Sequence, residues 1–262
     1  MLANQRQEAI LAVVRRDGAA RIADLVQALQ VSDMTVRRDV AELAGRGLVR
    51  RVHGGAVDTR RAAHEPGFQA KTGLFSPEKE AIAHAALGEI SPGGAVALSA
   101  GTTTHLVARL VAATPALRPL TVVTNSLPAA AVLHEASDPA LAVVLTGGTR
   151  TPSDALVGPL ATRALAALRV DLLVLGVHGV DPEGGLTTPN LLEAETNRAL
   201  VAAAGRTVVV ADHSKWGVVG LARIADLGEV DLVITDDALP PEALAATEAV
   251  VAVRVAPARR AS

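Results

Sequence analysis

The spacing of hydrophobic residues near the start of the chain predicts three short helices. Apolar side chains recur at helical spacing in residues 4–17 and again in residues 22–29. Asp17-Gly18 supplies the turn that ends the first helix. After a tight connection, Ser32 is a good N-cap for a third helix over residues 33–43. The sequence therefore predicts a small helical domain with a short turn between its second and third helices.

The third predicted helix has an apolar and a basic side. We expect the apolar residues to face inward; these are Met34, Val36, Val40 and Leu43. This arrangement leaves Thr35, Arg37 and Arg38 on the outer side. Residues 48–52 then alternate as a strand does, and they lead into His53-Gly54-Gly55-Ala56.

Two helices, a short turn and a basic strand in this order are typical of a winged helix-turn-helix. Its second helix would enter the major groove. There Arg37 and Arg38 can each donate a bidentate pair of hydrogen bonds to guanine or phosphate. Arg50 and Arg51 on the strand would hold the DNA backbone. The alternative is a solvated charged face, which is what most charge runs are. The candidate DNA-binding residues are Ser32, Thr35, Arg37, Arg38, Arg50, Arg51 and His53.

The remaining chain alternates short apolar runs with Ala- and Leu-rich segments of helical length. The predicted strands are residues 95–98, 120–123, 141–145, 172–175, 207–210 and 232–234. This pattern predicts an α/β domain with a mostly parallel sheet. We expect a DNA-binding domain over 1–57, a linker over 58–75, an α/β domain over 76–255 and a tail over 256–262.

Small, hydroxylated or Gly-rich loops follow five of these strands, which predicts one composite pocket at the carboxyl ends of the sheet. Gly101-Thr102-Thr103-Thr104 opens a helix, where free N–H groups and hydroxyls can bind an anion. The alternative is an ordinary capped turn. The chain has 3 Lys among its 25 basic residues, and Lys79 and Lys215 lie where a point charge could meet phosphate or carboxylate.

Composition narrows the class of protein. Half of the residues are hydrophobic, and there is no Cys, which excludes disulfides and thiolate chemistry. Residues 1–61 hold eleven Arg and seven acidic residues, a net charge of +4, whereas the rest of the chain carries −6. A basic N-terminal segment followed by a larger acidic segment suggests that the N-terminal segment binds nucleic acid. We see no signal peptide and no 18-residue apolar run, so we expect a soluble, cytoplasmic protein without a membrane partner.

Two strings in the first domain carry a specific resemblance. They are Val31-Ser32-Asp33-Met34-Thr35-Val36-Arg37-Arg38-Asp39-Val40 and Leu48-Val49-Arg50-Arg51-Val52-His53-Gly54-Gly55-Ala56. Both resemble the N-terminal domain of DeoR-family bacterial transcription regulators. The second domain is similar to that family's sensor domain, for instance at Glu78-Lys79-Glu80 and Asp212-His213-Ser214-Lys215-Trp216-Gly217. The resemblance covers nearly the whole chain.

The resemblance implies a sensor domain related in fold to ribose-5-phosphate isomerase and CoA transferases, which binds a phosphorylated sugar or similar metabolite. It implies these effector-binding residues: Lys79, Gly101, Thr102, Thr103, Thr104, Thr124, Asn125, Gly147, Gly148, Asp181 and Lys215. Ser99 stands where the family often has Asp, and Asn197 where it often has Lys. These two departures leave the identity of the effector open.

The alternative function is that of a sugar-phosphate isomerase-like enzyme. Isomerisation needs a carboxylate base, and the isomerase pattern has paired aspartates after a central strand. Alignment on Val180-Asp181-Pro182 puts Leu175 and His178 at those positions. Other carboxylates remain as candidate bases, namely Glu193, Glu195 and Asp212. The seven His are scattered without close ligand spacing, so we expect no metal and no cofactor.

We therefore expect a repressor of sugar or carbohydrate metabolism genes that is not an enzyme. Its partners would be a double-stranded DNA operator and a phosphorylated sugar or similar effector. One small DNA-binding domain gives too little affinity for DNA on its own, so we also expect a homo-oligomer that places at least two such domains on spaced half-sites. A phosphosugar-binding protein that merely retains a DNA-binding head is a further alternative.

Overall fold

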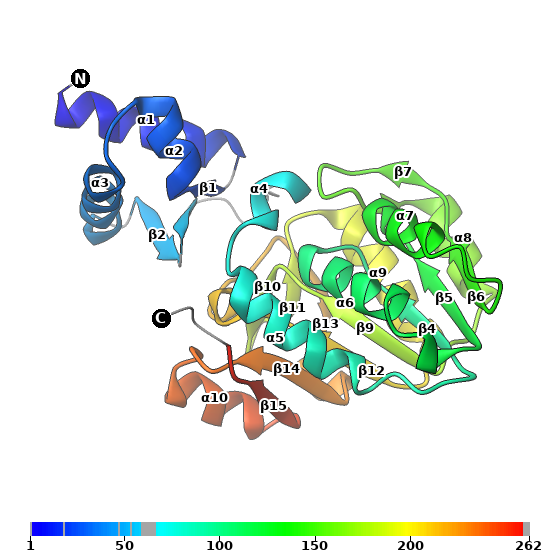
Figure 1. Ribbon diagram of the computed structural model, residues 1–262. Helices are drawn as coiled ribbons and strands as arrows, with labels where there is room; N and C mark the ends of the chain where they lie inside the picture. Colours follow the sequence, from blue (N-terminus) through cyan, green and yellow to red (C-terminus); the bar gives the residue numbers. More distant parts are fainter. Residues whose placement is uncertain (1, 18, 47, 53, 59–66, 259–262) are drawn as a thin grey trace. The chain divides into compact units, whose positions relative to one another are not determined.

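The computed structural model describes residues 2–17, 19–46, 48–52, 54–58 and 67–258. The chain divides into two compact units, Met1–Ser76 and Pro77–Ser262 (Figure 1). Each unit has its own hydrophobic core.

The first unit is a helical domain with a small sheet. Its elements are α1 (Ala3–Asp17), β1 (Ala19–Arg21), α2 (Ile22–Leu29), α3 (Asp33–Gly45), β2 (Val49–Val52), β3 (Gly55–Asp58) and α4 (Phe68–Thr72). The strands form an antiparallel sheet in the order β1-β3-β2. The sequence predicts the three long helices and β2, but it does not predict β1, because Ala-Ala-Arg has no strand signal.

The core of this unit lies between α1, α2, α3 and the sheet. Val36, Val40 and Leu43 of α3 are buried in it together with Ile10 of α1. The expectation that Met34 faces inward is wrong, because 80% of its surface is exposed. Met34 precedes Val36 by two residues, which is about 200° around a helix, so it lies on the opposite side.

Helix α4 falls inside residues 58–75, which the sequence predicts to be a linker. It packs against β1 of the first unit. The neighbouring chain also approaches that unit closely: a Cβ on Gly73 would lie 2.6 Å from the Arg21 guanidinium, and one on Gly55 would lie 2.9 Å from Leu74. The last part of the predicted linker is therefore an ordered part of the first unit.

The second unit is an α/β domain. Its first half contains α5 (Ser76–Leu87), β4 (Ala95–Leu98), α6 (Thr102–Ala112), η1 (Pro115–Leu117), β5 (Leu120–Thr124), α7 (Leu127–Glu135), β6 (Leu141–Leu145), β7 (Thr149–Arg150), β8 (Leu156–Val157) and α8 (Pro159–Ala166). Its second half contains β9 (Leu172–Gly176), β10 (Gly179–Asp181), β11 (Gly185–Thr188), α9 (Leu191–Ala203), β12 (Thr207–Val210), η2 (His213–Lys215), β13 (Ala222–Ala225), η3 (Leu227–Glu229), β14 (Leu232–Asp236), α10 (Pro241–Glu248) and β15 (Val253–Ala256).

Seven parallel strands form the main sheet, in the order β15-β14-β12-β9-β4-β5-β6. Each predicted apolar run coincides with one of these strands, so the expected α/β class with a mostly parallel sheet is confirmed. The sequence does not predict β15, an edge strand that carries the exposed Arg254. A smaller sheet of β10, β11 and β13 accompanies the main one.

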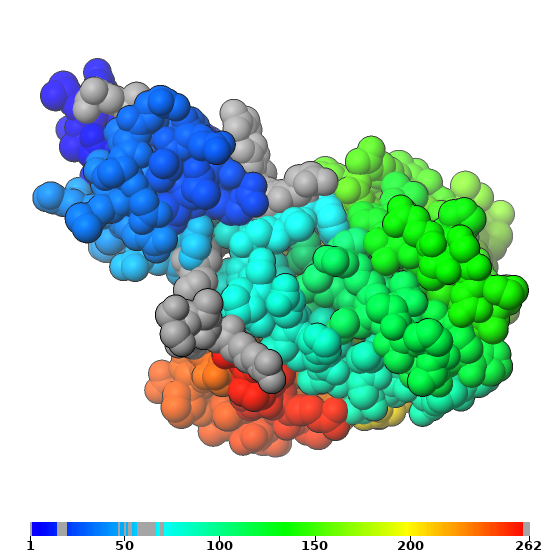
Figure 2. Space-filling view, in the orientation of Figure 1, coloured from blue at the N-terminus to red at the C-terminus, as the bar shows by residue number. Residues whose placement is uncertain are grey.

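Helices cover both faces of the main sheet, because the strands are apolar on both sides. Helices α5, α6 and α7 pack on one face and α8, α9 and α10 on the other. Figure 2 shows side chains of the first group closing over the sheet on the face in view. No described helix is both long and apolar enough to cross a membrane.

Candidate functional site

The outer surface of α3 carries the candidate DNA-binding residues. Ser32 is its N-cap: the Ser32 Oγ accepts a hydrogen bond from the Thr35 amide at 3.2 Å and lies 2.8 Å from the Thr35 hydroxyl. Ser32 and Thr35 thus fix the start of the helix. Both residues remain beside the outer face, since Ser32 is exposed and Thr35 is half-buried.

Met34, Arg37 and Arg38 project from this outer face. Arg37 pairs with Asp33, and the Nε of Arg38 lies 3.2 Å from Glu42 Oε1. Both pairs are well exposed, and such pairs are worth little in water. The two guanidinium groups can therefore leave their partners for DNA at low cost.

The inner side of α3 is fixed to α1. Arg6 makes a two-point ion pair with the buried Asp39, and Gln7 Nε2 donates to Glu42 Oε2 at 2.7 Å. The string Arg37-Arg38-Asp39 thus contains two outward cations and one inward anion. These contacts present the basic face on a rigid helix.

The small sheet supplies the remaining basic candidates. Arg50 and Arg51 lie on β2, opposite Val57 and Ala56 of β3, and the Arg51 side chain is exposed. His53, the last candidate, lies outside the described residues.

In the second unit, the chain order of the strands reverses between β4 and β9. From β4 the chain continues outward to β5 and β6, whereas from β9 it continues to β12, β14 and β15. Loops diverge at such a point and leave a crevice beyond the carboxyl ends of the strands. The Ser99 Oγ, which accepts the Gly176 amide at 2.9 Å, holds the two strand ends together.

Gly101–Thr104 forms the start of α6 at this crevice. Gly101 is the N-cap and has φ +155°, a conformation that favours glycine. It offers no capping side chain, so the first-turn amides of α6 are available to an anion. The Thr104 hydroxyl donates to the Gly101 carbonyl at 3.1 Å, which stabilises the loop.

Thr124 and Asn125 support this loop from the end of β5. The Thr124 hydroxyl donates to the Leu98 carbonyl at 2.7 Å. Asn125 Oδ1 accepts the Ala100 amide at 2.9 Å, and its Nδ2 donates to the Leu156 carbonyl at 3.2 Å. Both side chains are buried, and their hydrogen bonds position neighbouring loops.

Three other predicted residues shape loops of the second unit. Gly147 and Gly148 follow β6, and two strand steps of about 4.8 Å each separate them from the loop after β4. A Cβ on Gly148 would lie 2.5 Å from the Val157 carbonyl, so glycine is needed there for packing. Asp181 holds the turn between β10 and β11, where its Oδ1 accepts two amides at 3.0 and 2.7 Å.

Lys79 and Lys215 both act electrostatically on Asp212, which follows β12. Lys79 of α5 is buried, Lys215 of η2 is half-buried, and Asp212 is fully buried. Burial opposes ionisation of Asp212, but Lys215, Lys79, the Ser214 hydroxyl and His213 outweigh it and hold the pKa of Asp212 below its usual range. Asp212 is therefore a buried carboxylate that keeps its negative charge.

His213 and Asp236 extend this group of charges to β14. His213 Nδ1 lies 2.8 Å from Asp236 Oδ1, and the His213 amide donates to Asp236 Oδ2 at 2.7 Å. The hydrogen bond to Asp236 raises the pKa of His213; burial opposes the rise, and the charges of Asp236, Asp212 and Glu78 add to it. Together these residues form the charged cluster: Glu78, Lys79, Asp212, His213, Lys215 and Asp236.

Of the charged cluster, the sequence predicts only Lys79 and Lys215 as effector-binding residues. Asp212 and Asp236 stand at or just after strand ends, and Glu78 precedes Lys79, so their positions were a usable signal. The electrostatic interactions that make them one group depend on the packing of α5 over β12 and β14, which no local pattern reveals.

Glu193, one of the candidate bases, and the residues Asn197 and Trp216 have internal partners or lie in the core. Glu193 Oε1 accepts the hydroxyls of Thr151 and Ser153, and its Oε2 accepts that of Thr188 at 3.4 Å. Asn197 is buried on the same helix, α9. Trp216 packs in the core and donates its indole N–H to Thr247 at 3.0 Å.

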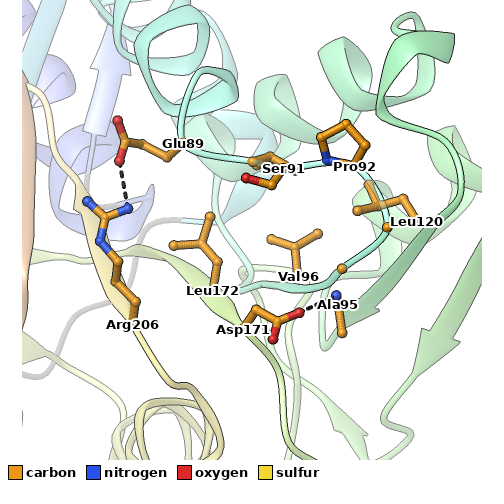
Figure 3. A pocket seen from close by; sticks show the side chains of 12 residues that line it. Glu89, Ser91, Pro92, Ala95, Val96, Leu120, Asp171, Leu172 and Arg206 are labelled. Atoms are coloured by element: carbon orange, nitrogen blue, oxygen red, sulfur yellow. Dashed lines mark hydrogen bonds and ion pairs between the residues drawn. The ribbon is translucent and has the colours of Figure 1, made fainter.

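A cavity of about 440 Å³ lies at the opposite edge of the sheet, beside the amino ends of β4, β5 and β9 (Figure 3). Its charged side chains already have partners. Glu89 pairs with Arg206 at 2.6 Å and with Arg254, and Asp171 Oδ2 accepts the Ala95 amide at 2.8 Å. We place the candidate ligand site at the carboxyl edge, where parallel sheets bind ligands.

Comparison with known proteins identifies both units. Residues 6–61 match the model of the DeoR-like helix-turn-helix domain, and residues 75–237 match that of the DeoR C terminal sensor domain. The HTH-type transcriptional regulator GlpR of Haloferax volcanii is 40% identical over 91% of this chain and 92% of its own length. The glycerol-3-phosphate regulon repressor of Escherichia coli is 32% identical over 92% of this chain and 93% of its own.

Similarity to solved structures is more limited. A D-ribose-5-phosphate isomerase in complex with phospho-erythronic acid aligns with TM-score 0.40 and 18% identity, over 53% of this chain and 52% of that chain. The chain thus spans about half the length of that structure. Matched over nearly all of its length by such regulators, the chain belongs to the DeoR family of DNA-binding transcriptional regulators.

Proposed function

We propose that this protein is a transcriptional repressor whose second unit senses a phosphorylated sugar or related metabolite and thereby changes operator binding. The observation that carries the proposal is the crevice between β4 and β12. It combines the amino end of α6 with the ammonium groups of Lys79 and Lys215. Backbone amides of this kind bind phosphate, and the charged cluster beside them offers polar contacts to the rest of a ligand.

The name of one relative supports the class of effector. The E. coli relative is named for the glycerol-3-phosphate regulon, so a protein of the same organisation is connected with a phosphorylated three-carbon compound. We assign the phosphate to the first turn of α6, with Gly101, Thr102, Thr103 and Thr104 around it. Thr124, Asn125 and Ser99 position this loop and need not touch the ligand.

On the DNA side, we propose that α3 enters the major groove with Arg37 and Arg38 toward the bases. Arg50 and Arg51 would hold the phosphate backbone. One such helix buries little DNA surface, so useful affinity requires two heads on spaced half-sites and hence a homo-oligomer. An operator-binding protein works where the chromosome is, which we take to be the cytoplasm.

Ligand binding would act by shifting a conformational equilibrium. A ligand changes operator affinity only if it binds one arrangement of the oligomer better than another. The crevice is formed by loops from strands on both sides of the reversal in strand order, so a ligand there can favour one relative placement of these loops.

The proposal is tested by titrating the full chain onto a labelled duplex from upstream of its own gene, with random duplex alongside, at two salt concentrations. The titration is then repeated with a panel of sugar phosphates. Sequence-preferring binding that the panel changes is expected. If neither this duplex nor a genomic fragment pool is preferred over random DNA, the operator-binding role fails. If binding is specific but indifferent to every phosphate ester, the sensing role fails.

A further inference from the structure

Two buried carboxylate oxygens at the candidate site have no hydrogen-bond donor among the described residues. They are Oε2 of Glu78 and Oδ2 of Asp212. Glu78 is 2% exposed and Asp212 is fully buried. A buried acceptor without a donor is costly, because it has lost its water and gained nothing in return.

The two oxygens of Asp212 have different surroundings. Oδ1 accepts the Ser214 amide at 3.1 Å and the Ser214 hydroxyl, whereas Oδ2 accepts no hydrogen bond. The nearby ammonium groups lower the pKa of Asp212, so the carboxylate does not relieve the cost by taking up a proton. Asp212 Oδ2 is thus a charged acceptor that lacks a donor.

The charged cluster is unsuited to hold the phosphate itself. Its three carboxylates, Glu78, Asp212 and Asp236, offset the positive charges of Lys79, Lys215 and protonated His213. A second anion placed against Asp212 and Glu78 would be repelled. By contrast, the first turn of α6 has N–H groups and no acidic residue. The crevice therefore has two different ends. The first turn of α6 can bind an anion, and Asp212 and Glu78 can accept hydrogen bonds from a ligand.

We propose that Asp212 Oδ2 and Glu78 Oε2 bind hydroxyl groups of the effector, whose phosphate lies at the first turn of α6. This inference rests on the proposed sensing function and narrows its ligand. The effector is a phosphate monoester that carries at least two free hydroxyls away from the phosphate. Simple phosphate, alkyl phosphates and anions with a carboxylate at the far end bind more weakly.

The spacing of the strands fits a ligand with two distinct ends. The α6 loop follows β4 and Asp212 follows β12, with β9 between them. Two strand steps separate these loops by about 10 Å. Hydroxyl groups are the donors that satisfy a carboxylate without adding charge, and a site with unpaired acceptors discriminates strongly against analogues that lack the donor.

The experiment compares polyol and alkyl phosphates on the full chain by calorimetric titration. The probes are glycerol 3-phosphate, ribose 5-phosphate, fructose 1-phosphate and fructose 6-phosphate, against propyl, pentyl and hexyl phosphate and inorganic phosphate. We expect at least one polyol phosphate to bind about tenfold or more tightly than the alkyl phosphate of equal carbon count.

Two isosteric variants connect this preference to the carboxylates. Asp212→Asn keeps an oxygen for Ser214 and turns the donor-less oxygen into an N–H₂ group, and Glu78→Gln does the same on α5. Each is expected to reduce the polyol preference about tenfold while leaving alkyl phosphate affinity nearly unchanged. Glu80→Gln removes the same charge from an exposed position of the same helix and should change neither affinity. Melting curves identify any variant that fails to fold.

The outcomes separate this inference from the function on which it rests. If no phosphate ester binds, the sensing function and the inference both fail. If alkyl phosphates bind as tightly as polyol phosphates, or if both folded variants keep the full polyol preference, phosphate sensing stands and the inference is overturned.

Discussion

Arg6 of α1 and Asp39 of α3 form a two-point ion pair inside the DNA-binding unit. Asp39 is almost fully buried, and Arg37 and Arg38 immediately before it point outward. The pair therefore determines which side of α3 faces the core and which side can face DNA.

Asp39→Asn is expected to lower the melting temperature of the DNA-binding unit by several degrees, because the partly buried Arg6 guanidinium loses its counter-charge. It should weaken binding to operator and random duplex alike. Asp33→Asn is the control, since Asp33 pairs with Arg37 on the exposed face. Circular dichroism melting measures both variants, and equal stability losses would contradict a special role for Asp39.

Arg38→Ala is expected to weaken operator binding by about 1–3 kcal/mol, with a smaller loss on random duplex. The physical reason is that Arg38 is highly exposed on the outer face and can exchange Glu42 for a base edge. Fluorescence anisotropy titrations on both duplexes test this. Equal losses on the two duplexes would mean that Arg38 contacts only phosphate.

Met34 is expected to read thymine methyl groups, because it is a large apolar side chain exposed between two arginines. Once the operator is known, replacing the contacted thymine by deoxyuridine should cost about 0.8 kcal/mol. The same replacement should have no effect on Met34→Ala. A methyl effect that persists in the variant would rule out this contact.

Lys215→Ala is expected to abolish the effector response while leaving operator affinity close to wild type. Its ammonium group helps to keep Asp212 ionised, and it lies in a different unit from α3. Arg163→Ala, an exposed cation on α8, is the matched control. Operator titration with and without sugar phosphate measures the response. An unchanged response would remove Lys215 from the site.

The second unit is expected to lose stability as the pH rises through the pKa of His213. Asp236 raises the pKa of His213 in the folded protein, so the stabilisation is fully present below the ordinary histidine value of about 6.5 and is lost above the raised one. His213→Gln removes this dependence. The difference in melting temperature between wild type and variant should shrink with rising pH, and a constant difference would contradict the assignment.

The sequence predicts the long elements of the fold well. Apolar runs such as Leu172–Gly176 and Thr207–Val210 coincide with strands, because buried parallel strands are apolar on both sides. It misses β1, β15 and the side of α3 on which Met34 lies. Strand pairing creates β1 from Ala-Ala-Arg, which carries no strand signal of its own, whereas Val-Arg-Val-Ala of β15 alternates as a strand does but is short.

The site is predicted only in part. Strand-end loops point to Gly101 and Lys215, because parallel strands bring their carboxyl ends to one edge, and Lys79 stands out as one of only three lysines. Nothing local distinguishes a polar side chain that faces a ligand from one, such as Asn125 or Asp181, that braces a neighbouring loop. The charged cluster joins α5, β12 and β14, and only the folded structure shows those partners.

The hydrogen bond between Ser99 and Gly176 connects residues 77 positions apart in the chain. Asp212 lies still further along, so the crevice exists only after most of the second unit has folded. Contacts so distant in sequence are slow to form. A ligand that binds there stabilises only the fully folded chain, because it does not bind partly folded species. The concentration of the metabolite would then affect two properties of the protein: its lifetime before degradation by cellular proteases, and its binding to the operator.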